Sequence, residues 1–405
     1  MYSILKNKNE GLKPHVLEFA RHLVATPSPS FGEGAVADLV EAKMHEIGYD
    51  KVVRDDAGNV VGVLFGREAA PTTLLNCHMD TAIAGAVDAP TSGRAGWIAG
   101  AGAADCKGGL AAQVFAGALL KRSLLPLRGN LVVAASVAEE HGSSAGVRAL
   151  LQRTLPELGL QPAHAILGEP TDMGLYYGHD GRVEFNILVK GPNPFQVNDA
   201  VSAIFNDLRA YEGSPSADSA QDVQRSAIQW PRFRDTEDGR SAIIAMTRRL
   251  AADESPANVM SSINHQARLA ARPGSAVAVE VMIAEEMRKL YTGQTTTVSH
   301  VTNAWSTDPF DPLISRARQA LAAADVTVRP GRWRLGRLGM GTAGGVLTRE
   351  FHVPVIGFGP GSEDLAHTSD ERVEESRITD AVYGTASIVH SLVGIPVVGW
   401  TSDEI

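Results

Sequence analysis

Five short segments of this sequence place metal-binding side chains inside otherwise apolar, glycine-rich surroundings. In the first segment, the mostly apolar residues 74–77 are followed by His78, and Asp80 comes two positions later. A carboxylate so placed can accept the imidazole N–H that faces away from a metal, which fixes the tautomer and makes the histidine a better ligand. Taken alone, this spacing is more typical of a histidine that is buried and hydrogen-bonded in the protein core than of a metal ligand.

Two further segments contribute carboxylates that a cation would stabilise. Asp105 lies in the glycine-rich stretch 100–110, where a single aspartate is usually a helix N-cap. Glu139 and Glu140 come just after the apolar run 132–137, and adjacent carboxylates repel each other unless a cation or a proton compensates. A metal cluster would compensate this charge, with one glutamate as a ligand and its neighbour as a proton shuttle.

The last two segments complete the set. Glu169 comes just after the apolar residues 165–167, and His367 lies in the glycine-rich stretch 357–369. Each residue has an ordinary interpretation by itself, but five ligand-type residues at the ends of apolar strands together predict a metal site. Histidine and carboxylate ligands without a set of thiolates favour hydrolytic zinc, manganese or cobalt over iron–sulfur or cysteine-rich structural zinc.

The elements that must position these residues alternate between strands and helices. Helical apolar spacing predicts two helices within residues 14–47, separated by a loop rich in proline, serine and glycine, and a long helix over residues 109–121. Short apolar runs predict strands over residues 51–54, 60–65, 73–77 and 131–136. This alternation predicts an α/β layered catalytic domain.

A second region follows Tyr177 and has a different composition. Its pattern predicts an α+β unit of order βαββαβ, with strands at 182–190, 242–246, 266–271 and 295–301, helices at 198–211 and 276–291, and a polar connection at 213–240. The catalytic pattern resumes near Pro309, so this unit is inserted. We therefore expect a catalytic domain formed by residues 1–182 and 305–405, and an inserted domain at 183–304.

Composition limits the possible partners and the compartment. The chain has 405 residues with 44% hydrophobic and 20% charged residues, as expected for a globular protein of two domains. Its net charge of −9 without a basic stripe argues against nucleic acid. The absence of a signal peptide or a bilayer-length apolar run predicts a cytoplasmic protein without membrane contact. Cys77 and Cys106 suit a reducing compartment and are expected to be buried small hydrophobic residues.

The five segments together resemble one family of enzymes. The ordered motifs HMD at 78–80, DCKGG at 105–109, EEHG at 139–142, GEPT at 168–171 and GFGPG…AHTSDE at 357–371 are similar to those of co-catalytic metallo-amidohydrolases. That family includes acetylornithine deacetylase, succinyl-diaminopimelate desuccinylase, aminoacylase and glutamate carboxypeptidase. The resemblance covers nearly the whole chain. It implies a mixed-sheet α/β metallohydrolase domain, with an inserted α+β lid or dimerisation domain and a homodimer formed through it.

The resemblance also implies roles for the ligand-type residues. His78, Glu169 and a bridging Asp105 would hold one divalent metal, and Glu140, His367 and the same Asp105 would hold the other. Zinc is the expected metal, with manganese or cobalt as alternatives. Paired divalent cations lower the pKa of a shared water and polarise the scissile carbonyl.

Two more residues receive catalytic roles from the resemblance. Asp80 would orient His78. Glu139 would act first as general base and then as general acid, taking a proton from the metal-bridging water and giving it to the leaving nitrogen.

Substrate contacts follow from the same resemblance. Asn258 and Arg272 resemble the family's substrate-contacting pair, and Thr342 lies in its glycine–threonine element. The planar fork of Arg272 can bind both oxygens of a carboxylate, although an arginine that caps a strand at the surface fits the sequence equally well.

The chain departs from the family pattern at three places. Residues 189–195 lack the usual lid histidine, which leaves its role vacant or moved to one of three candidates: His179, His265 and His300. Residues 341–345 read GTAGG where relatives have Gly-Thr-Asp or Gly-Thr-Ser-Asp, and Asp180 stands where an arginine is common. All expected metal ligands are kept, so these departures bear on the predicted substrate more than on the predicted hydrolysis.

The sequence therefore predicts a two-metal hydrolase that cleaves an amide-type C–N bond in a small carboxylate-bearing, amino-acid-like molecule. An aminohydrolase that releases ammonia with the same metal-bound hydroxide is an alternative. A catalytically inactive homologue that only binds a small molecule is another, but the intact Glu139 and the five intact ligands argue against it.

Overall fold

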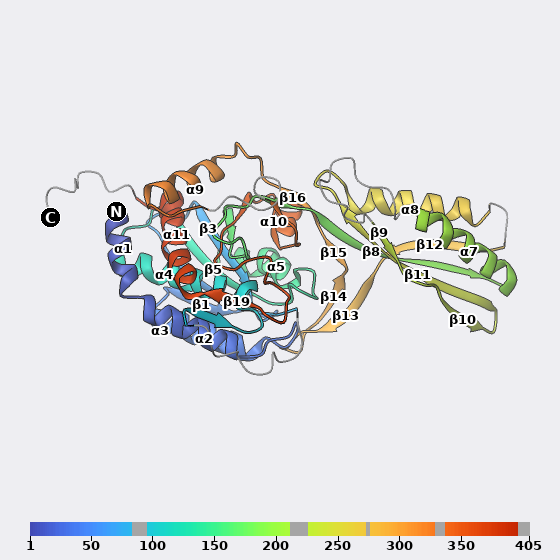
Figure 1. Ribbon diagram of the computed structural model, residues 1–405, viewed down its shortest axis with the longest axis horizontal. Coiled ribbons are helices and arrows are strands. Elements are labelled where there is room, and N and C mark those ends of the chain that lie inside the picture. The colour runs from blue at the N-terminus through green and yellow to red at the C-terminus, as the bar shows by residue number, and fades with distance from the viewer. Residues whose placement is uncertain (83–94, 211–225, 273–275, 329–336, 396–405) are drawn as a thin grey trace. The chain divides into compact units, whose positions relative to one another are not determined.

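The computed structural model describes residues 1–82, 95–210, 226–272, 276–328 and 337–395 (Figure 1). Its contacts divide the chain into two compact units. Unit 1 comprises residues 1–179, 287–296 and 305–405, and unit 2 comprises residues 180–286 and 297–304. This division differs from the expected insert at 183–304, because residues 287–296 make their contacts with unit 1.

Unit 1 is built on a mixed sheet of six strands in the order β1-β2-β5-β3-β6-β18. The strands are β1 (Lys51–Arg54), β2 (Val60–Leu64), β3 (Thr72–His78), β5 (Asn130–Ser136), β6 (Pro162–Leu167) and β18 (Val355–Gly357). The pairs β1/β2 and β2/β5 are antiparallel, whereas β5, β3, β6 and β18 are mutually parallel. The predicted mixed α/β fold is thus confirmed.

The parallel strands bring their carboxyl ends to one edge of the sheet, where α/β proteins usually bind ligands. His78 is the last residue of β3, and the pair Glu139 and Glu140 comes just after β5. Glu169 follows β6, and His367 lies in the segment after β18. Topology alone therefore brings these segments together.

Helices cover the sheet of unit 1 (Figure 1). Helices α4 (Gly108–Ser123) and α11 (Glu375–Val393) pack against each other and against β3 and β5. Helix α3 (Gly34–Ile47) packs against β1 and β2. Every residue of β2, β3 and β5 is buried, as expected for strands whose two faces are both covered.

Shorter elements complete unit 1. Its other helices are α1 (Tyr2–Glu10), α2 (Lys13–Ala25), α5 (Ala145–Ala149), α6 (Leu155–Glu157), α9 (Pro312–Ala323) and α10 (Gly344–Phe351), with π-helical turns η1 (Ala103–Lys107) and η2 (Leu150–Thr154). Its short strands are β4 (Trp97–Ala99), β7 (Gly178–His179), β16 (Trp305–Ser306), β17 (Arg337–Leu338) and β19 (Arg372–Glu374). Within the described parts of the chain, no helix is long and apolar enough to cross a membrane.

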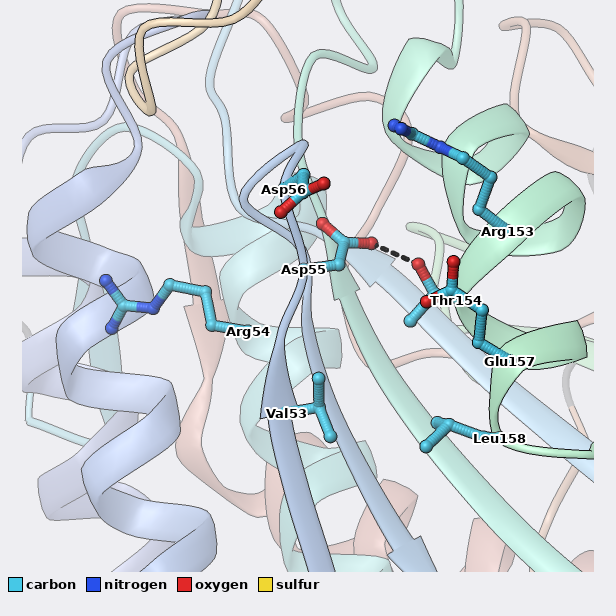
Figure 2. Close-up of a pocket in the computed structure, with 8 residues that line it drawn as sticks. All are labelled: Val53, Arg54, Asp55, Asp56, Arg153, Thr154, Glu157 and Leu158. Atoms are coloured by element: carbon cyan, nitrogen blue, oxygen red, sulfur yellow. Dashed lines mark hydrogen bonds between the residues drawn. The ribbon is translucent and has the colours of Figure 1, made fainter.

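The turn between β1 and β2 borders a small cavity of about 170 Å³ (Figure 2). Asp55 in this turn accepts a hydrogen bond of 2.7 Å from the hydroxyl of Thr154, which lies on the opposite wall. The cavity walls are predominantly polar and include Arg54, Asp56 and Arg153.

Unit 2 has its own sheet and its own core. The sheet contains β10 (Arg232–Thr236), β11 (Gly239–Leu250), β8 (Gly181–Gly191) and β12 (Ala278–Ile283) in this order, with β9 (Ser226–Ile228) paired to β11 and β15 (Val301–Thr302) paired to β8. Helices α7 (Pro194–Ala210) and α8 (Pro256–Ala270) pack on it. Alternate residues of β8 are buried, as its sequence pattern predicts: Val183, Phe185, Ile187 and Val189.

Three predictions for unit 2 are wrong. Residues 266–271, predicted as a strand, form the end of α8 and the residue after it, because Ser255 caps this helix by accepting the N–H of Asn258 and Pro256 starts it. Residues 276–291, predicted as a helix, contain β12 and β13 (Glu285–Lys289). The buried residues of β12, Val279 and Val281, recur at every second position, as in a strand with one covered face.

The third error concerns the polar connection at 213–240. Strands β9 and β10 lie within it, and residues 213–225 lie outside the described part of the chain. Strand β10 is exposed along its whole length, so it carries no apolar pattern by which a sequence could reveal it.

Candidate metal centre

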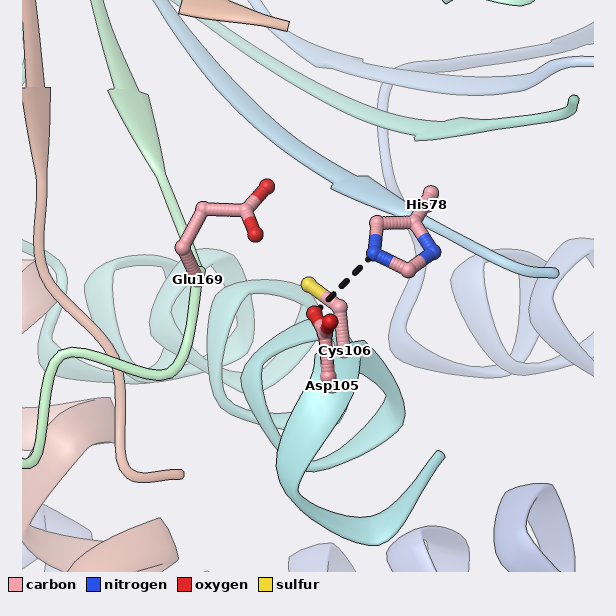
Figure 3. Close-up of side chains that lie close together, drawn as sticks. All are labelled: His78, Asp105, Cys106 and Glu169. Atoms are coloured by element: carbon pink, nitrogen blue, oxygen red, sulfur yellow. Dashed lines mark hydrogen bonds and ion pairs between the residues drawn. The ribbon is translucent and has the colours of Figure 1, made fainter. Parts of the chain in front are cut away.

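The first donor group lies at the carboxyl ends of β3 and β6. His78, Asp105, Cys106 and Glu169 each offer one ligand atom, and these atoms all lie within 4.8 Å of one another. Figure 3 shows the four side chains converging from β3, from the π-helical turn η1 just before α4 and from the segment after β6. All four residues are buried.

The hydrogen bonds of His78 leave one ring nitrogen for a cation. Its Nδ1 lies 2.9 Å from the backbone oxygen of Asp80, and because a carbonyl only accepts, Nδ1 carries the proton. In the neutral ring, Nε2 then presents a lone pair to Oδ1 of Asp105 at 3.2 Å. A lone pair facing a carboxylate is unfavourable unless a positive charge lies between them.

Asp80 orients His78 through a different atom from the one expected. The backbone carbonyl makes the contact, whereas the nearer carboxylate oxygen lies 3.6 Å from Nδ1. That carboxylate instead accepts the backbone N–H groups of Glu139 and Glu140, each at 3.0 Å. Asp80 therefore connects the His78 segment to the segment that carries the glutamate pair.

The second donor group consists of Asp105, Glu140 and His367. Nε2 of His367 lies 2.8 Å from Oε1 of Glu140 and 3.0 Å from Oδ2 of Asp105. A neutral imidazole has at most one N–H at Nε2, so it cannot donate a full hydrogen bond to both carboxylates. Asp105 thus directs one oxygen at each group, Oδ1 toward His78 and Oδ2 toward His367, as a bridging ligand requires.

The electrostatics of the two groups call for added positive charge. Burial, reinforced by the charge of Asp105, raises the pKa of Glu169 well above its ordinary value. Burial would lower the pKa of His78, but Asp105 outweighs it and raises that pKa. Hydrogen bonds to Asp105 and Glu140 raise the pKa of His367 to about 10. Protons compensate the carboxylates when cations are absent, and divalent cations fit the same donors.

Asp105 is held by a buried carboxylate. Oε1 of Glu371 accepts the backbone N–H groups of Ala104 and Asp105 at 3.0 and 2.9 Å, and Oε2 accepts that of Gly102 at 2.9 Å. These three bonds fix the turn before α4 from which Asp105 projects. Such outer contacts commonly fix the orientation of metal ligands.

Glu139 has one oxygen engaged and one available. Its Oε1 accepts a hydrogen bond of 2.9 Å from the hydroxyl of Ser144, while Oε2 is buried and has no hydrogen-bond partner. Burial raises the pKa of Glu139 to about 7, against the opposing effect of His78. A carboxylate with such a pKa can both take and give a proton near neutral pH.

Comparison with known proteins decides the family. A family model described as peptidase family M20/M25/M40 matches residues 74–391. The chain belongs to this family. The LysW-lysine hydrolase of Deinococcus radiodurans is 26% identical over 93% of this chain and 97% of its own length. The uncharacterized protein YgeY of Escherichia coli K12 is 25% identical over 96% of each chain.

Solved structures show the same fold. The Bacillus subtilis YXEP protein, a dinuclear metal-binding peptidase from the M20 family, aligns with a TM-score of 0.69 at 15% identity, over 94% of this chain and 98% of its own. A putative aminohydrolase from methicillin-resistant Staphylococcus aureus aligns with a TM-score of 0.70 at 16% identity, over 97% and 100% of the two chains. As a member of family M20, the chain is a metal-dependent hydrolase of amide-type C–N bonds.

The residues expected to contact substrate in this M20 hydrolase have separate locations. Asn258 lies in the first turn of α8 and Arg272 just after its end, and both are exposed residues of unit 2. Thr342 is buried in unit 1, where its hydroxyl accepts the N–H of Gly344 and lies 3.0 Å from Nε2 of His179. Their contacts with substrate stay predictions.

The candidates for the missing lid histidine differ in their surroundings. His179 is fully buried and also accepts the backbone N–H of Thr342 at 2.9 Å. His265 is exposed on α8. His300 lies between two carboxylates, with Nδ1 3.1 Å from Glu184 and Nε2 3.5 Å from Glu286.

Cys106 and Glu371 were not identified as site residues from the sequence. The sequence predicts Cys106 to be a buried hydrophobic residue. Its burial is confirmed, but its sulfur also lies in the first donor group. In the sequence, only its position next to Asp105 indicates that Cys106 could be a ligand. Glu371 ends the last family motif, and only the fold reveals that it holds the turn before α4.

Proposed function

We propose that this chain is a two-metal amidohydrolase that acts on a small amino-acid-like substrate carrying a carboxylate. The observation that carries the proposal is the position of Asp105, whose two oxygens face two separate donor groups. One bridging carboxylate between two histidine–carboxylate sets suits a paired-cation centre.

The ligands divide between two cation positions. The first comprises His78, Glu169 and Asp105, with the sulfur of Cys106 as a fourth donor within reach. The second comprises Glu140, His367 and the same Asp105. Zinc suits these donors, and manganese and cobalt are the alternatives. When bound, the two cations supply Lewis acidity to the substrate carbonyl and acidify a shared water.

Glu139 handles the protons of the reaction. Its free Oε2 takes a proton from the attacking water, and the same group then gives that proton to the nitrogen that leaves. Ser144 holds the other oxygen and so fixes the direction of the carboxylate. Asp80 supports this step because its two oxygens hold the backbone of Glu139 and Glu140.

The names of relatives support the substrate class. Curated relatives include LysW-lysine hydrolases and probable carboxypeptidases, such as one from Aspergillus terreus that is 31% identical over 47% of this chain. We assign the recognition of the substrate carboxylate to Arg272, with Asn258 and Thr342 as further contacts. We also propose a cytoplasmic location, which suits the two free thiols, and a homodimer formed through unit 2.

The test combines metal analysis with a substrate panel. We expect about two divalent metals per chain in the wild type, and one position lost in each of His78→Ala and His367→Ala. The panel contains N-acyl, N-carbamoyl and peptide derivatives of amino acids, and release of acid, amine and ammonia is measured separately. Full metal occupancy in either variant would overturn the ligand assignment. Release of ammonia alone would identify an aminohydrolase.

A further inference from the structure

Five consecutive backbone N–H groups of the loop 137–141, which carries Glu139 and Glu140, all donate to side chains. The bonds are Val137 to Asn59 Oδ1 (3.0 Å), Ala138 to Glu33 Oε1 (2.9 Å), Glu139 to Asp80 Oδ1 (3.0 Å), Glu140 to Asp80 Oδ2 (3.0 Å) and His141 to Ser30 Oγ (3.3 Å). Since no strand or helix supplies these bonds, four side chains set the path of the loop.

The four accepting side chains are themselves fixed. Asn59, Glu33 and Asp80 are fully buried, and the hydroxyl of Ser30 donates to Oδ2 of Asp80 at 2.6 Å. The amide of Asn59 donates to Oδ2 of Asp55 at 2.8 Å. The position of the segment that carries each acceptor therefore helps to determine the position of the loop.

Asn59 depends on the turn between β1 and β2. Oδ1 of Asp55 accepts the backbone N–H groups of Gly58 and Asn59, each at 2.9 Å. Its Oδ2 also accepts from Thr154 across the cavity in Figure 2. Asp55 thus holds both the backbone and the side chain of Asn59.

The tip of the hairpin formed by β13 and β14 (Thr295–Ser299) contacts this turn. The hydroxyl of Tyr291 donates to the carbonyl of Gly58 at 2.8 Å, and that of Thr292 donates to the carbonyl of Asp56 at 2.9 Å. The ring packs so closely that a Cβ on Gly58 would lie 2.4 Å from it, and one on Gly34 would lie 3.1 Å from it. These glycines are the chain neighbours of Asn59 and Glu33.

We propose that Tyr291 is a positioning residue for the Glu139 and Glu140 loop. It fixes the chain next to Asn59 and next to Glu33, and these two residues hold the backbone of Val137 and Ala138. The inference rests on the proposed roles of Glu140 as a ligand and Glu139 as the proton carrier. It adds a residue that belongs to neither donor group and that lies in a segment flanked in sequence by unit 2.

The experiment measures kinetics and metal affinity in Tyr291→Ala. Outer contacts of a metal site typically contribute about 10–100-fold to metal affinity or activity. We expect kcat to fall by about tenfold or more with little change in KM, and the cation held by Glu140 to bind more weakly in titrations against a chelator. Tyr291→Phe keeps the ring packing and should recover most of both quantities.

The matched control is Tyr383→Ala, which removes a buried tyrosine of unit 1. Its hydroxyl, like that of the partly buried Tyr291, donates to a backbone carbonyl, that of Tyr2. It should lower the melting temperature without changing kcat or metal affinity. Thr292→Val, at an exposed position, tests the second tip contact in a variant that keeps its fold and should shift both quantities in the direction of Tyr291→Ala.

Equal effects of Tyr291→Ala and Tyr383→Ala on kcat and metal affinity would overturn the inference, as would normal values in Thr292→Val. Metal titration works without a substrate. A wild type that binds two cations but hydrolyses nothing on the panel would therefore refute the proposed function, while the titration still decides the role of Tyr291.

Discussion

At the scale of single residues, Glu139 offers the most direct test of the chemistry. Glu139→Gln keeps the size of the side chain and the bond from Ser144 but cannot accept the proton. We expect kcat to fall by about 10²–10⁴-fold, the usual contribution of a general acid–base group. Metal content and melting temperature should stay close to the wild type. Near-normal turnover would show that another group carries the proton.

Cys106 adds a sulfur to the first donor group, which the family resemblance did not predict. Thiolate is a soft ligand that binds cobalt and zinc well and manganese poorly. We expect the cobalt-loaded protein to show a sulfur-to-cobalt charge-transfer band that Cys106→Ser removes. Cys77→Ser is the control, because Cys77 is equally buried but lies outside the donor group. A wild-type spectrum without this band would show that the sulfur does not bind the cation.

The sequence predicted residue types better than contacts. His78 and Glu169 could be identified as candidate ligands because each comes directly after a mostly apolar run, and this pattern can be recognised in the sequence alone. The carbonyl of Asp80, and not its carboxylate, meets His78 because the loop 137–141 takes up both carboxylate oxygens, and that loop is distant in the sequence. Glu33 could not be identified, because its partner Ala138 lies 105 residues away.

At the scale of elements, one close contact holds the start of α4 against the end of β6. A Cβ on Gly109 would lie 1.9 Å from the carbonyl oxygen of Gly168, next to Glu169. This contact brings the segment of Asp105 to that of Glu169. We expect Gly109→Ala to push the two segments apart and to lower metal affinity at the first position by about 10–100-fold, as for loss of other outer contacts.

The control for this prediction is a glycine without such a contact. A Cβ on Gly11, just after α1, would come no closer than 3.7 Å to other atoms, and its φ of −71° suits alanine. Gly11→Ala should therefore leave metal affinity unchanged. Unchanged affinity in Gly109→Ala as well would mean that the helix start adjusts without moving the ligands.

The fully buried strands of unit 1 were predictable, whereas β12, with one buried face, and the largely exposed β13 were not. Strands β3 and β5 lie within one residue of their predicted bounds at each end, because each is fully buried and contains consecutive apolar residues. The segment of β13 contains helix-forming glutamate, methionine, arginine and lysine, and these local preferences concealed its strand. Tertiary pairing decided the structure there.

At the scale of the whole molecule, Glu33 should make stability depend on pH. Burial, with a further effect of Asp80, raises the pKa of Glu33 from 4.5 to about 7. Between about pH 4.5 and about pH 7 the unfolded chain loses this proton first, so the folded state binds more protons and stability falls as pH rises. The difference of about 2.5 pKa units corresponds to about 3 kcal/mol, since one unit is about 1.36 kcal/mol.

Glu33→Gln keeps an oxygen for the N–H of Ala138 and removes this titration. Relative to the wild type, its free energy of unfolding should therefore increase across this pH window and reach a plateau above about pH 7. Urea denaturation at several pH values measures the difference. Glu18→Gln, at an exposed position, serves as the control. A difference that does not change with pH would contradict a raised pKa.

Substrate recognition concerns the whole molecule, because Arg272 belongs to unit 2 whereas the donor groups belong to unit 1. If the guanidinium pairs with the substrate carboxylate, Arg272→Ala loses a charge-assisted contact of about 1.5–3 kcal/mol. We expect this loss to raise KM and to lower kcat/KM by about 10- to 150-fold. Arg272→Lys should recover only part of it, because a point charge does not reproduce the bidentate fork.

The measurement compares matched substrates with and without the carboxylate. Arg268, an exposed arginine in the last turn of α8, provides the control variant Arg268→Ala, which should affect neither substrate. A selective loss with the carboxylate substrate would assign acid recognition to Arg272 and would show that unit 2 takes part in catalysis. An equal loss with both substrates would instead assign Arg272 a structural role at the end of α8, where its φ of 61° already lies in the left-handed region.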